Sequence, residues 1–268
     1  LEGAGHRPPL PDDPPTTRSP GDLQAQADAS GRVPFAVAVL GPSAGHGALS
    51  APLADFTVMT DEGAIFTAGP PLVKASLGED ITKEDLGGPS VALGSGLIHN
   101  HASDDEDALG QIRTWLSYLP SSAWQRPPTD DDAEGDRSTP ELVDLVAANP
   151  RQPYDMANVI TTIMDANSFF EVQSGFGQSI LTGFARLGGQ PVAVVANQPQ
   201  HLAGAINVDA ADKATQFITV ADSFHVPLIF LTDNPGVLAG SASEKAGILK
   251  YAGRMFAAQH AATVPKIQ

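Results

Sequence analysis

The 268-residue chain contains no cysteine, which excludes disulfide bonds, thiolate metal sites and a cysteine nucleophile. Lysine and arginine are scarce, 15 against 31 aspartates and glutamates, so the formal net charge is −16. A chain this acidic has no general surface for nucleic acid or for an anionic membrane. Any phosphate group that it binds must meet a local basic patch or backbone N–H groups.

Long hydrophobic runs are also missing. No stretch approaches 18 consecutive apolar residues, and no basic N-terminal segment precedes an apolar one. We therefore expect neither a transmembrane helix nor a secretory signal peptide. The chain begins with Leu1 and ends with VPKIQ, which is typical of the start of a strand. We expect it to be cut at both ends.

The motifs of several large enzyme classes are absent. The sequence has no HExxH, no GxxxxGK[ST], no GxSxG and no GxGxxG that opens a strand–helix unit. Ser43 and Ser50 lie near glycines, but no base stands at a recognisable spacing from either. His101, His201, His225 and His260 are scattered along the chain. Such spacing is more typical of histidines at the surface or bonded internally than of a set of metal ligands, so we expect no metal site.

Apolar patterning predicts strands that alternate with helices. The run Pro34–Leu40 predicts a strand buried on both faces of a sheet. In the helix predicted from Ser103 to Leu119, Ser103 and Glu106 form a capping box. Further helices are predicted over 22–30, 155–165, 209–224 and 244–262, and further strands over 55–60, 64–67, 179–185, 191–196 and 227–231. This alternation indicates an α/β fold with crossover connections.

A change of composition divides the chain. Residues 120–153 are rich in Pro, Asp, Arg and Ser and include Asp130-Asp131-Asp132, which is typical of a solvated linker. We predict an N-terminal domain over 1–119 and a C-terminal domain over 154–268. In both halves, a glycine turn, an irregular loop and a helix precede a Val-Pro pair, which is Val33-Pro34 in the first half and Val264-Pro265 in the second. This shared order predicts that the two domains arose by duplication.

Two glycine-containing turns follow predicted strands. Gly41–Gly47 runs into a helix and leaves several N–H groups without intrahelical acceptors. Such donors, with the positive end of the helix dipole, can stabilise a developing oxyanion. An ordinary tight turn explains the same residues equally well. Asp233-Asn234-Pro235-Gly236 is equally typical of a simple β-turn.

These same regions resemble a known family. Phe169–Ile267 contains the blocks FFEVQ, TGFARLGGQPVAVVANQP, DNPGVLAG and TVPKI, and the first half contains GPSAGHGA, PLADF, TAGPPLVKASLGE and LSYLPS. In this order, the blocks resemble the carboxyltransferase (β) subunits of biotin-dependent acyl-CoA carboxylases, the propionyl-, acetyl- and methylcrotonyl-CoA carboxylase group. The resemblance covers nearly the whole chain and is weakest over 8–30 and in the linker.

The resemblance implies a fold and a mechanism. The fold would be α/β, with two crotonase-like ββα-spiral domains, each incomplete in this chain. The first would hold acyl-CoA and the second carboxybiotin presented by a carrier protein. Each would have an oxyanion hole of backbone N–H groups, one for the enolate of the thioester and one for the ureido oxygen of biotin. Such a mechanism needs no side-chain base, since it depends on positioning and electrostatic stabilisation.

The resemblance also assigns residues on the thioester side. The two backbone donors of the oxyanion hole would be Gly45 and His46, with Ala44 and Gly47 beside them as substrate-binding residues. His46 stands where the family has a glycine. Its N–H would keep its place if φ there is negative, whereas a positive φ would be strained.

The remaining site residues lie in other turns. The family's SGGAR turn corresponds to Gly3–Arg7, which makes Gly5 and His6 substrate-binding positions. Its PGF turn corresponds to Pro235-Gly236-Val237, which places Gly236 and Val237 on the biotin side. Arg7, Lys74 and Lys83 are candidates by location to meet the phosphates of CoA, beside the alternative that each is a solvated surface residue.

The resemblance predicts an enzyme that transfers CO2 from carboxybiotin to the α-carbon of an acyl-CoA. Two alternatives stay open: a biotin-dependent acyl-CoA decarboxylase subunit, and a non-catalytic assembly subunit, which His6 and His46 favour. The implied partners are a biotin carboxylase/biotin carboxyl carrier subunit and further copies of the chain, as a hexamer in the full-length form. The implied location is cytoplasmic, with the mitochondrial matrix as the alternative.

Overall fold

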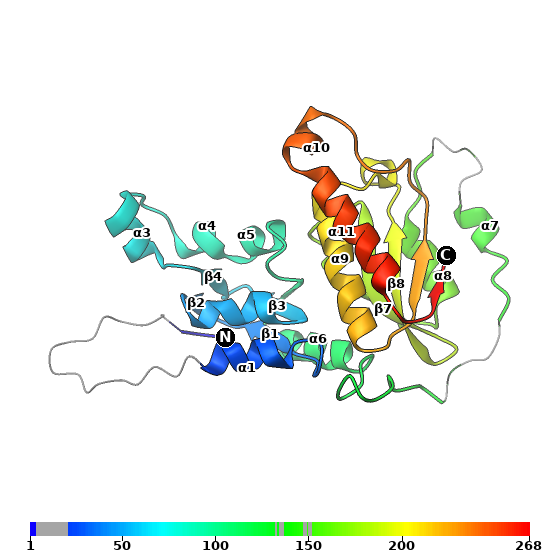
Figure 1. Ribbon diagram of the computed structural model, residues 1–268, viewed down its shortest axis with the longest axis horizontal. Helices are drawn as coiled ribbons and strands as arrows, with labels where there is room; N and C mark the ends of the chain where they lie inside the picture. Colours follow the sequence, from blue (N-terminus) through cyan, green and yellow to red (C-terminus); the bar gives the residue numbers. More distant parts are fainter. Residues whose placement is uncertain (4–20, 132, 134–136, 147–148, 150–151) are drawn as a thin grey trace. The chain divides into compact units, whose positions relative to one another are not determined.

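The computed structural model describes residues 1–3, 21–131, 133, 137–146, 149 and 152–268. These residues form two compact units, Leu1–Arg113 and Thr114–Gln268 (Figure 1). Helix α6 (Asp105–Leu116) crosses the division. In the described part of the chain, no helix has the length and apolar character needed to cross a membrane.

Two small parallel sheets form the first unit. One has the strand order β1–β3–β5, and the other pairs β2 with β4. The strands are β1 (Ala36–Val39), β2 (Pro42–Ala44), β3 (Phe56–Thr60), β4 (Ala64–Phe66) and β5 (Asn100–Ala102). The other helices are α1 (Gly21–Ala29), the 3₁₀ helix η1 (Gly47–Leu49), α2 (Ser50–Leu53), α3 (Pro70–Leu77), α4 (Lys83–Gly87) and α5 (Pro89–Gly94). The strands predicted over 55–60 and 64–67 and the helix over 22–30 are confirmed.

Strand β1 is buried on one face only. Val37 and Val39 lie in a buried cluster with Met59 and Ile65, whereas the alternate positions, both alanine, are half-buried. The prediction that this strand is buried on both faces is therefore wrong for this chain. The reason is that the two-residue period of a strand turns only the valines toward this cluster, and the described residues cover the opposite face only in part.

Helix α6 begins with a different cap from the predicted one. Asp104 Oδ1 accepts the Asp107 N–H at 2.9 Å, and Asp107 Oδ2 accepts the Ser103 N–H at 2.9 Å. The capping side chains are thus those of Asp104 and Asp107 instead of Ser103 and Glu106, because a carboxylate is as good an acceptor for the free N–H groups. Trp115 and Leu119 are buried as expected.

A five-stranded mixed sheet forms the centre of the second unit, in the order β10–β9–β8–β7–β6. The strands are β6 (Phe170–Val172), β7 (Ile180–Leu187), β8 (Gln190–Asn197), β9 (Leu228–Leu231) and β10 (Lys266–Ile267). Strands β6, β7 and β8 are antiparallel, and β8, β9 and β10 are parallel. Gly188 and Gly189 join β7 to β8 with φ of 57° and 75°, the backbone that a tight hairpin turn requires.

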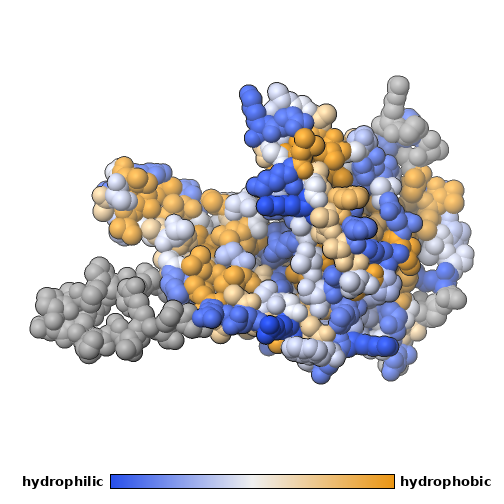
Figure 2. All heavy atoms as spheres, viewed as in Figure 1, coloured by the Kyte–Doolittle hydropathy of each residue, from blue (hydrophilic) through white to orange (hydrophobic). Residues whose placement is uncertain are grey.

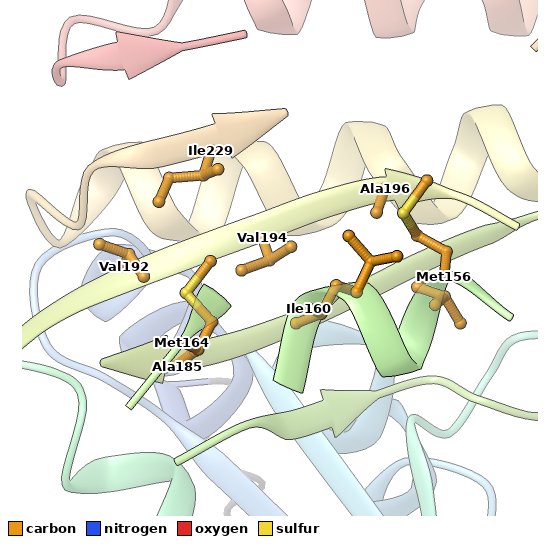
Figure 3. Close-up of a cluster of buried hydrophobic side chains, with 10 residues drawn as sticks. Met156, Ile160, Met164, Ala185, Val192, Val194, Ala196 and Ile229 are labelled. Carbon is orange, nitrogen blue, oxygen red and sulfur yellow. The ribbon is translucent and has the colours of Figure 1, made fainter. Parts of the chain in front are cut away.

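Helices cover both faces of this sheet (Figure 1). On one face, Met156 and Ile160 of α8 (Met156–Ile163) point toward Val194 and Ala196 of β8 (Figure 3). The other face is covered by α9 (Val208–Ser223), which packs beside α11 (Ile248–Ala261). A 3₁₀ helix, η2 (Leu202–Gly204), precedes α9. The helices predicted over 155–165 and 209–224 are confirmed.

One predicted helix is divided in two. The apolar pattern over 244–262 predicts a continuous helix, but the structure has α10 (Ser241–Lys245) followed by α11. Gly247 separates them with a φ of 86°. A left-handed glycine ends a helix, so the prediction of one helix is wrong.

The described residues between 120 and 153 belong to the second unit and contact its sheet and helix α8. The Asp130 N–H donates to the Gly189 carbonyl at 2.9 Å, and the Arg186 guanidinium donates to the Pro128 carbonyl at 3.1 Å. Helix α7 (Leu142–Leu145) adds two leucines to the edge of the α8 cluster. Asp130 and Asp131 are exposed, as expected for an acidic run.

Candidate functional site

The glycine turn Gly41–Gly47 ends β2 and starts η1 in the first unit. Gly45 has a left-handed φ of 67°, and His46 has the right-handed helical φ of −56° and ψ of −45°. The Ala48 and Leu49 N–H groups donate to the Gly45 and His46 carbonyls at 3.1 and 3.2 Å. The turn therefore passes from strand to helix, and His46 occupies it without strain.

The N–H groups of this turn differ in their partners. The Ala44 N–H donates to the Gly3 carbonyl at 3.0 Å, and the Gly45 N–H donates to the Phe66 carbonyl of β4 at 3.2 Å. Within the described residues, the N–H groups of His46 and Gly47 have no hydrogen-bond partner. The bond to Phe66 argues against Gly45 as an oxyanion donor. The unpaired donors are consecutive, but they lie one residue later than the resemblance implies.

The side chain of His46 is bound elsewhere. Its Nε2 lies 3.0 Å from each carboxylate oxygen of Asp22, in the first turn of α1. This hydrogen bond lowers the pKa of the Asp22 carboxyl. Both side chains are exposed. The imidazole thus connects the glycine turn to α1, while the His46 backbone keeps its N–H.

The remaining described candidates of the first unit are two lysines. Ala4, Gly5, His6 and Arg7 lie outside the described residues. Lys74 of α3 forms an exposed ion pair with Asp80 at 2.8 Å, and Lys83 at the start of α4 lies 3.5 Å from Glu84. Lys74 and Lys83 therefore each already have a carboxylate beside them. Figure 2 shows hydrophobic side chains at the surface around α3, where Leu72 and Leu77 are exposed.

The second unit contains a cavity of about 580 Å³, which is within the usual range for small-molecule sites. It lies between the ends of β8 and β9, one side of α11 and the turn that contains Val237. Its lining includes Asn197, Phe230, Asn234, Val237, Phe256 and His260. Of the two predicted biotin-side residues, Val237 lines the cavity, whereas Gly236 does not.

The turn at 233–237 is organised by a side chain. Gly236 has a φ of 111°, and its N–H donates to Asn234 Oδ1 at 2.7 Å. This is an Asx turn, in which a side chain replaces the backbone acceptor of a simple β-turn. Gly236 O and Leu238 N–H bond to Ile206 at 3.1 and 2.9 Å. The Val237 N–H has no hydrogen-bond partner among the described residues.

Two titratable groups of the second unit are held by hydrogen bonds. The Tyr154 hydroxyl donates to Asp233 Oδ2 at 2.8 Å; burial and this bond raise the pKa of Tyr154 to about 12. On α9, the buried Lys213 donates from Nζ to the Phe176 and Ile180 carbonyls at 3.0 and 2.8 Å. Burial lowers the pKa of Lys213, and the charge of Glu171 opposes that effect.

The described histidines form no ligand set. His101 pairs with Asp61 at 2.7 Å, and His225 bonds to the Ala123 carbonyl at 2.7 Å. His201 is exposed. No group of three or more potential metal ligands occurs in the part of the chain that the structure describes. His260 differs, because it stacks on Phe256 and lines the cavity.

Among the cavity-lining residues that sequence reasoning did not assign to a site are Asn197, Asn234 and His260. Signals for them were present. Asn197 ends an apolar strand, Asn234 stands in an Asn-Pro-Gly turn, and His260 follows Phe256 at helical spacing. None of these patterns by itself shows that the residues share one cavity, because that depends on the packing of α11 against the sheet.

Comparison with known proteins agrees with the resemblance. The model of the carboxyl transferase domain family matches residues 21–268. The chain is 38% identical over 256 residues to the biotin-dependent acetyl-/propionyl-coenzyme A carboxylase beta5 subunit of Mycobacterium tuberculosis, covering 89% of this chain and 45% of that protein. It is 37% identical over 243 residues to the methylmalonyl-CoA decarboxylase subunit alpha of Veillonella parvula, covering 90% and 48%. The chain spans about half the length of these curated relatives.

Solved structures agree at the level of fold. Transcarboxylase 12S, described as a hexamer with methylmalonyl-coenzyme A and methylmalonic acid bound, matches with a TM-score of 0.88 and 37% identity over 91% of this chain and 48% of that one. A single-chain, multi-domain long-chain acyl-CoA carboxylase matches with a TM-score of 0.82 and 29% identity, covering 96% and 25%. The expected crotonase-like α/β fold is confirmed.

Proposed function

Because this chain belongs to the carboxyl transferase domain family, we propose that it serves the transfer of a carboxyl group from carboxybiotin to the α-carbon of an acyl-CoA. The observation that carries the proposal is the glycine turn after β2. There, the consecutive N–H groups of His46 and Gly47 have no partner within the described residues. Two adjacent backbone donors are what a developing oxyanion requires.

On the thioester side, we propose that His46 and Gly47 donate to the carbonyl oxygen of the acyl-CoA. Negative charge develops on that oxygen when the α-carbon loses its proton, and the hydrogen bonds from preorganised donors to it then become stronger. Gly45, with its φ of 67°, turns the chain so that the next two N–H groups leave the β2–β4 ladder. Ala44 and Gly47 supply small side chains or none, so a ligand can approach the backbone closely.

The proposed reaction uses no side-chain base at this turn; the His46 Nε2 lies 3.0 Å from Asp22 Oδ1, and the role assigned to His46 is that of its backbone N–H. Carboxybiotin supplies the CO2 and, by the family resemblance, the nitrogen that accepts the α-proton. What the chain contributes is the position of the thioester and the stabilisation of its oxygen. We also propose that the side chains of Arg7, Lys74 and Lys83 bind the phosphates of CoA.

On the biotin side, the proposal uses the turn at 233–237 and the adjacent cavity. Gly236 already donates to Asn234, so Val237 is the residue of the predicted pair whose N–H is available to an oxygen. The cavity is large enough for a bicyclic head group of biotin size. We thus propose an acyl-CoA role for the domain at 1–119, a biotin role for the domain at 154–268, and a connecting role for 120–153.

The proposed partners are an acyl-CoA, a biotin carboxylase/biotin carboxyl carrier subunit and further copies of the chain in a hexamer. The hexameric transcarboxylase 12S supports the last of these. A second candidate function is biotin-dependent decarboxylation, which the decarboxylase subunit of Veillonella parvula favours. The assembly-subunit alternative is weakened, because a negative φ at His46 keeps the backbone N–H of that position intact.

One assay separates these functions. The full-length protein is incubated either with acetyl-, propionyl- or butyryl-CoA and a carboxylated biotin ester, or with a malonyl-type thioester and free biotin. The products of both incubations are measured by mass spectrometry. Carboxylated thioester supports the proposed function. Turnover from malonyl-type thioesters alone would replace it with decarboxylation. An intact oligomer without turnover in either direction would instead support a role in assembly.

A further inference from the structure

Two asparagines connect the loops beside the cavity of the second unit. Asn234 Nδ2 donates to Asn197 Oδ1 at 2.8 Å, and Asn197 Nδ2 donates to the Gly204 carbonyl at 3.1 Å. At the other end, Asn234 Oδ1 accepts the Gly236 N–H at 2.7 Å. Three hydrogen bonds in series therefore run from Gly204 to Gly236 through two side chains.

The backbone at both ends of this series is constrained. Leu202, Ala203 and Gly204 have consecutive left-handed φ values of 51°, 51° and 76°, and Gly236 has a φ of 111°. A Cβ on Gly204 would collide with the Asp233 carbonyl oxygen, so the two loops touch through their backbones. Left-handed non-glycine residues cost of the order of 1 kcal/mol each and persist only where their surroundings hold them.

Both asparagines line the cavity and are joined by one hydrogen bond. Asn197 is 6% exposed, Asn234 is half-buried, and both line the cavity. In each amide, the oxygen accepts one of the three bonds and the nitrogen donates another. Turning either amide over would break two bonds at once, and buried amide groups are costly to leave unpaired. The orientation of both side chains is therefore fixed.

We propose that Asn197 and Asn234 are positioning residues for the biotin-side turn. Asn234 accepts the Gly236 N–H, and Asn197 holds the Asn234 amide in place. The Val237 N–H is then the donor that the turn presents to the cavity. The ligand oxygen that it meets is the carbonyl oxygen of a cyclic urea. This inference rests on the proposed function for the identity of that ligand, but not for the hydrogen bonds themselves.

The first test measures the turn without any ligand. Amide exchange of Gly236 is followed by NMR in the 268-residue chain. Asn234→Ala removes the acceptor of the Gly236 N–H, and exchange is expected to accelerate about fivefold, the value of one neutral hydrogen bond. Asn234→Asp keeps an acceptor and is expected to keep exchange slow. Asn158→Ala, at an exposed position of α8, is the control. Unchanged exchange in Asn234→Ala would overturn the proposal.

The second test separates positioning from general stability. In the full-length protein, free biotin stimulates decarboxylation of a malonyl-type thioester if the proposed function is right. Asn234→Ala and Asn197→Ala are expected to lower kcat/KM for biotin about tenfold and to leave KM for the thioester unchanged. Equal losses for both substrates would overturn the positioning role. Absence of biotin-dependent turnover in the unaltered protein would overturn the proposed function, while the exchange experiment still decides whether the asparagines hold the turn.

Discussion

The imidazole Nε2 of His46 lies 3.0 Å from both carboxylate oxygens of Asp22, which joins the glycine turn after β2 to the first turn of α1. Both side chains are more than half exposed, so solvent screens the pair. The backbone of His46 is right-handed helical, a conformation open to every residue. The side chain and the N–H of His46 therefore have separate roles: the first contacts α1, and the second is a candidate oxyanion donor.

His46→Gly should preserve or raise carboxyl transfer. Glycine keeps the N–H that the proposed function uses and removes only the imidazole, which contacts Asp22 of α1. The measurement is the rate of acyl-CoA carboxylation by the full-length protein, with Asp22→Asn as the variant that weakens the ion pair alone. A fall of more than about a hundredfold, the effect of losing an oxyanion donor, would show that the imidazole takes part in the reaction.

Gly45→Ala should destabilise the chain by about 1–2 kcal/mol, the cost of a left-handed alanine. Strain is the cause, because the nearest atom to the new Cβ would be the Thr67 carbonyl oxygen at 3.8 Å. Gly47→Ala is the matched variant: its Cβ would lie 4.0 Å from Ser43 Oγ and its φ is not left-handed. Urea unfolding should show a loss for Gly45→Ala alone. Equal losses would contradict the assigned backbone.

The elements with strong local signals were predictable from the sequence. The β7–β8 hairpin has two glycines between apolar strands, and α9 has a regular apolar stripe that begins after the capping side chain of Asn207. The break at Gly247 was missed, because helical spacing continues on both sides of it and a single glycine inside such a pattern is tolerated.

The candidate site was predictable in position but not in detail. The sequence indicated the turn at Gly41–Gly47, since turn residues follow an apolar run there. It did not indicate that Gly45 donates to Phe66, because Phe66 reaches the turn only through the pairing of β2 with β4. The Asn197–Asn234 bond was hidden for the same reason: its partners are 37 residues apart.

Asp55→Asn should stabilise the chain at neutral pH. Asp55 Oδ2 accepts the Phe35 N–H at 2.9 Å, and burial raises the pKa of Asp55 to about 6. The folded state therefore holds this proton more tightly than the unfolded state does. The contribution of Asp55 to stability is complete below pH ~4 and is lost as the pH rises through ~6. Asparagine keeps an acceptor without the charge.

The gain from Asp55→Asn is expected to be about 2–3 kcal/mol at pH 7.5 and close to zero at pH 4. It is measured as the difference in unfolding free energy between variant and unaltered chain at each pH, which cancels the titration of other groups. Asp28→Asn, at an exposed position of α1, is the control. A gain of the same size at both values of pH would contradict the raised pKa.

Lys213→Met should destabilise the chain by about 2–4 kcal/mol. Methionine has a similar length but leaves the Phe176 and Ile180 carbonyls without the donor that Nζ supplies. Urea unfolding at pH 7 measures the loss, and Lys245→Met, at an exposed position of α10, should change little. An equal effect of the two variants would show that the contacts of Nζ contribute nothing measurable.

The loss caused by Lys213→Met should also depend on pH, in a direction that the burial of Lys213 determines. Burial lowers the pKa of this ammonium in the folded state, so the folded chain gives up the proton at a lower pH than the unfolded chain does. Between those two pKa values the unfolded state binds more protons, and the stability of the unaltered chain rises with pH. The methionine variant lacks this titration. The difference between the two should therefore widen from pH 7 to pH 10, and a difference that narrows over this range would mean that the charged form is the one that the buried carbonyls favour.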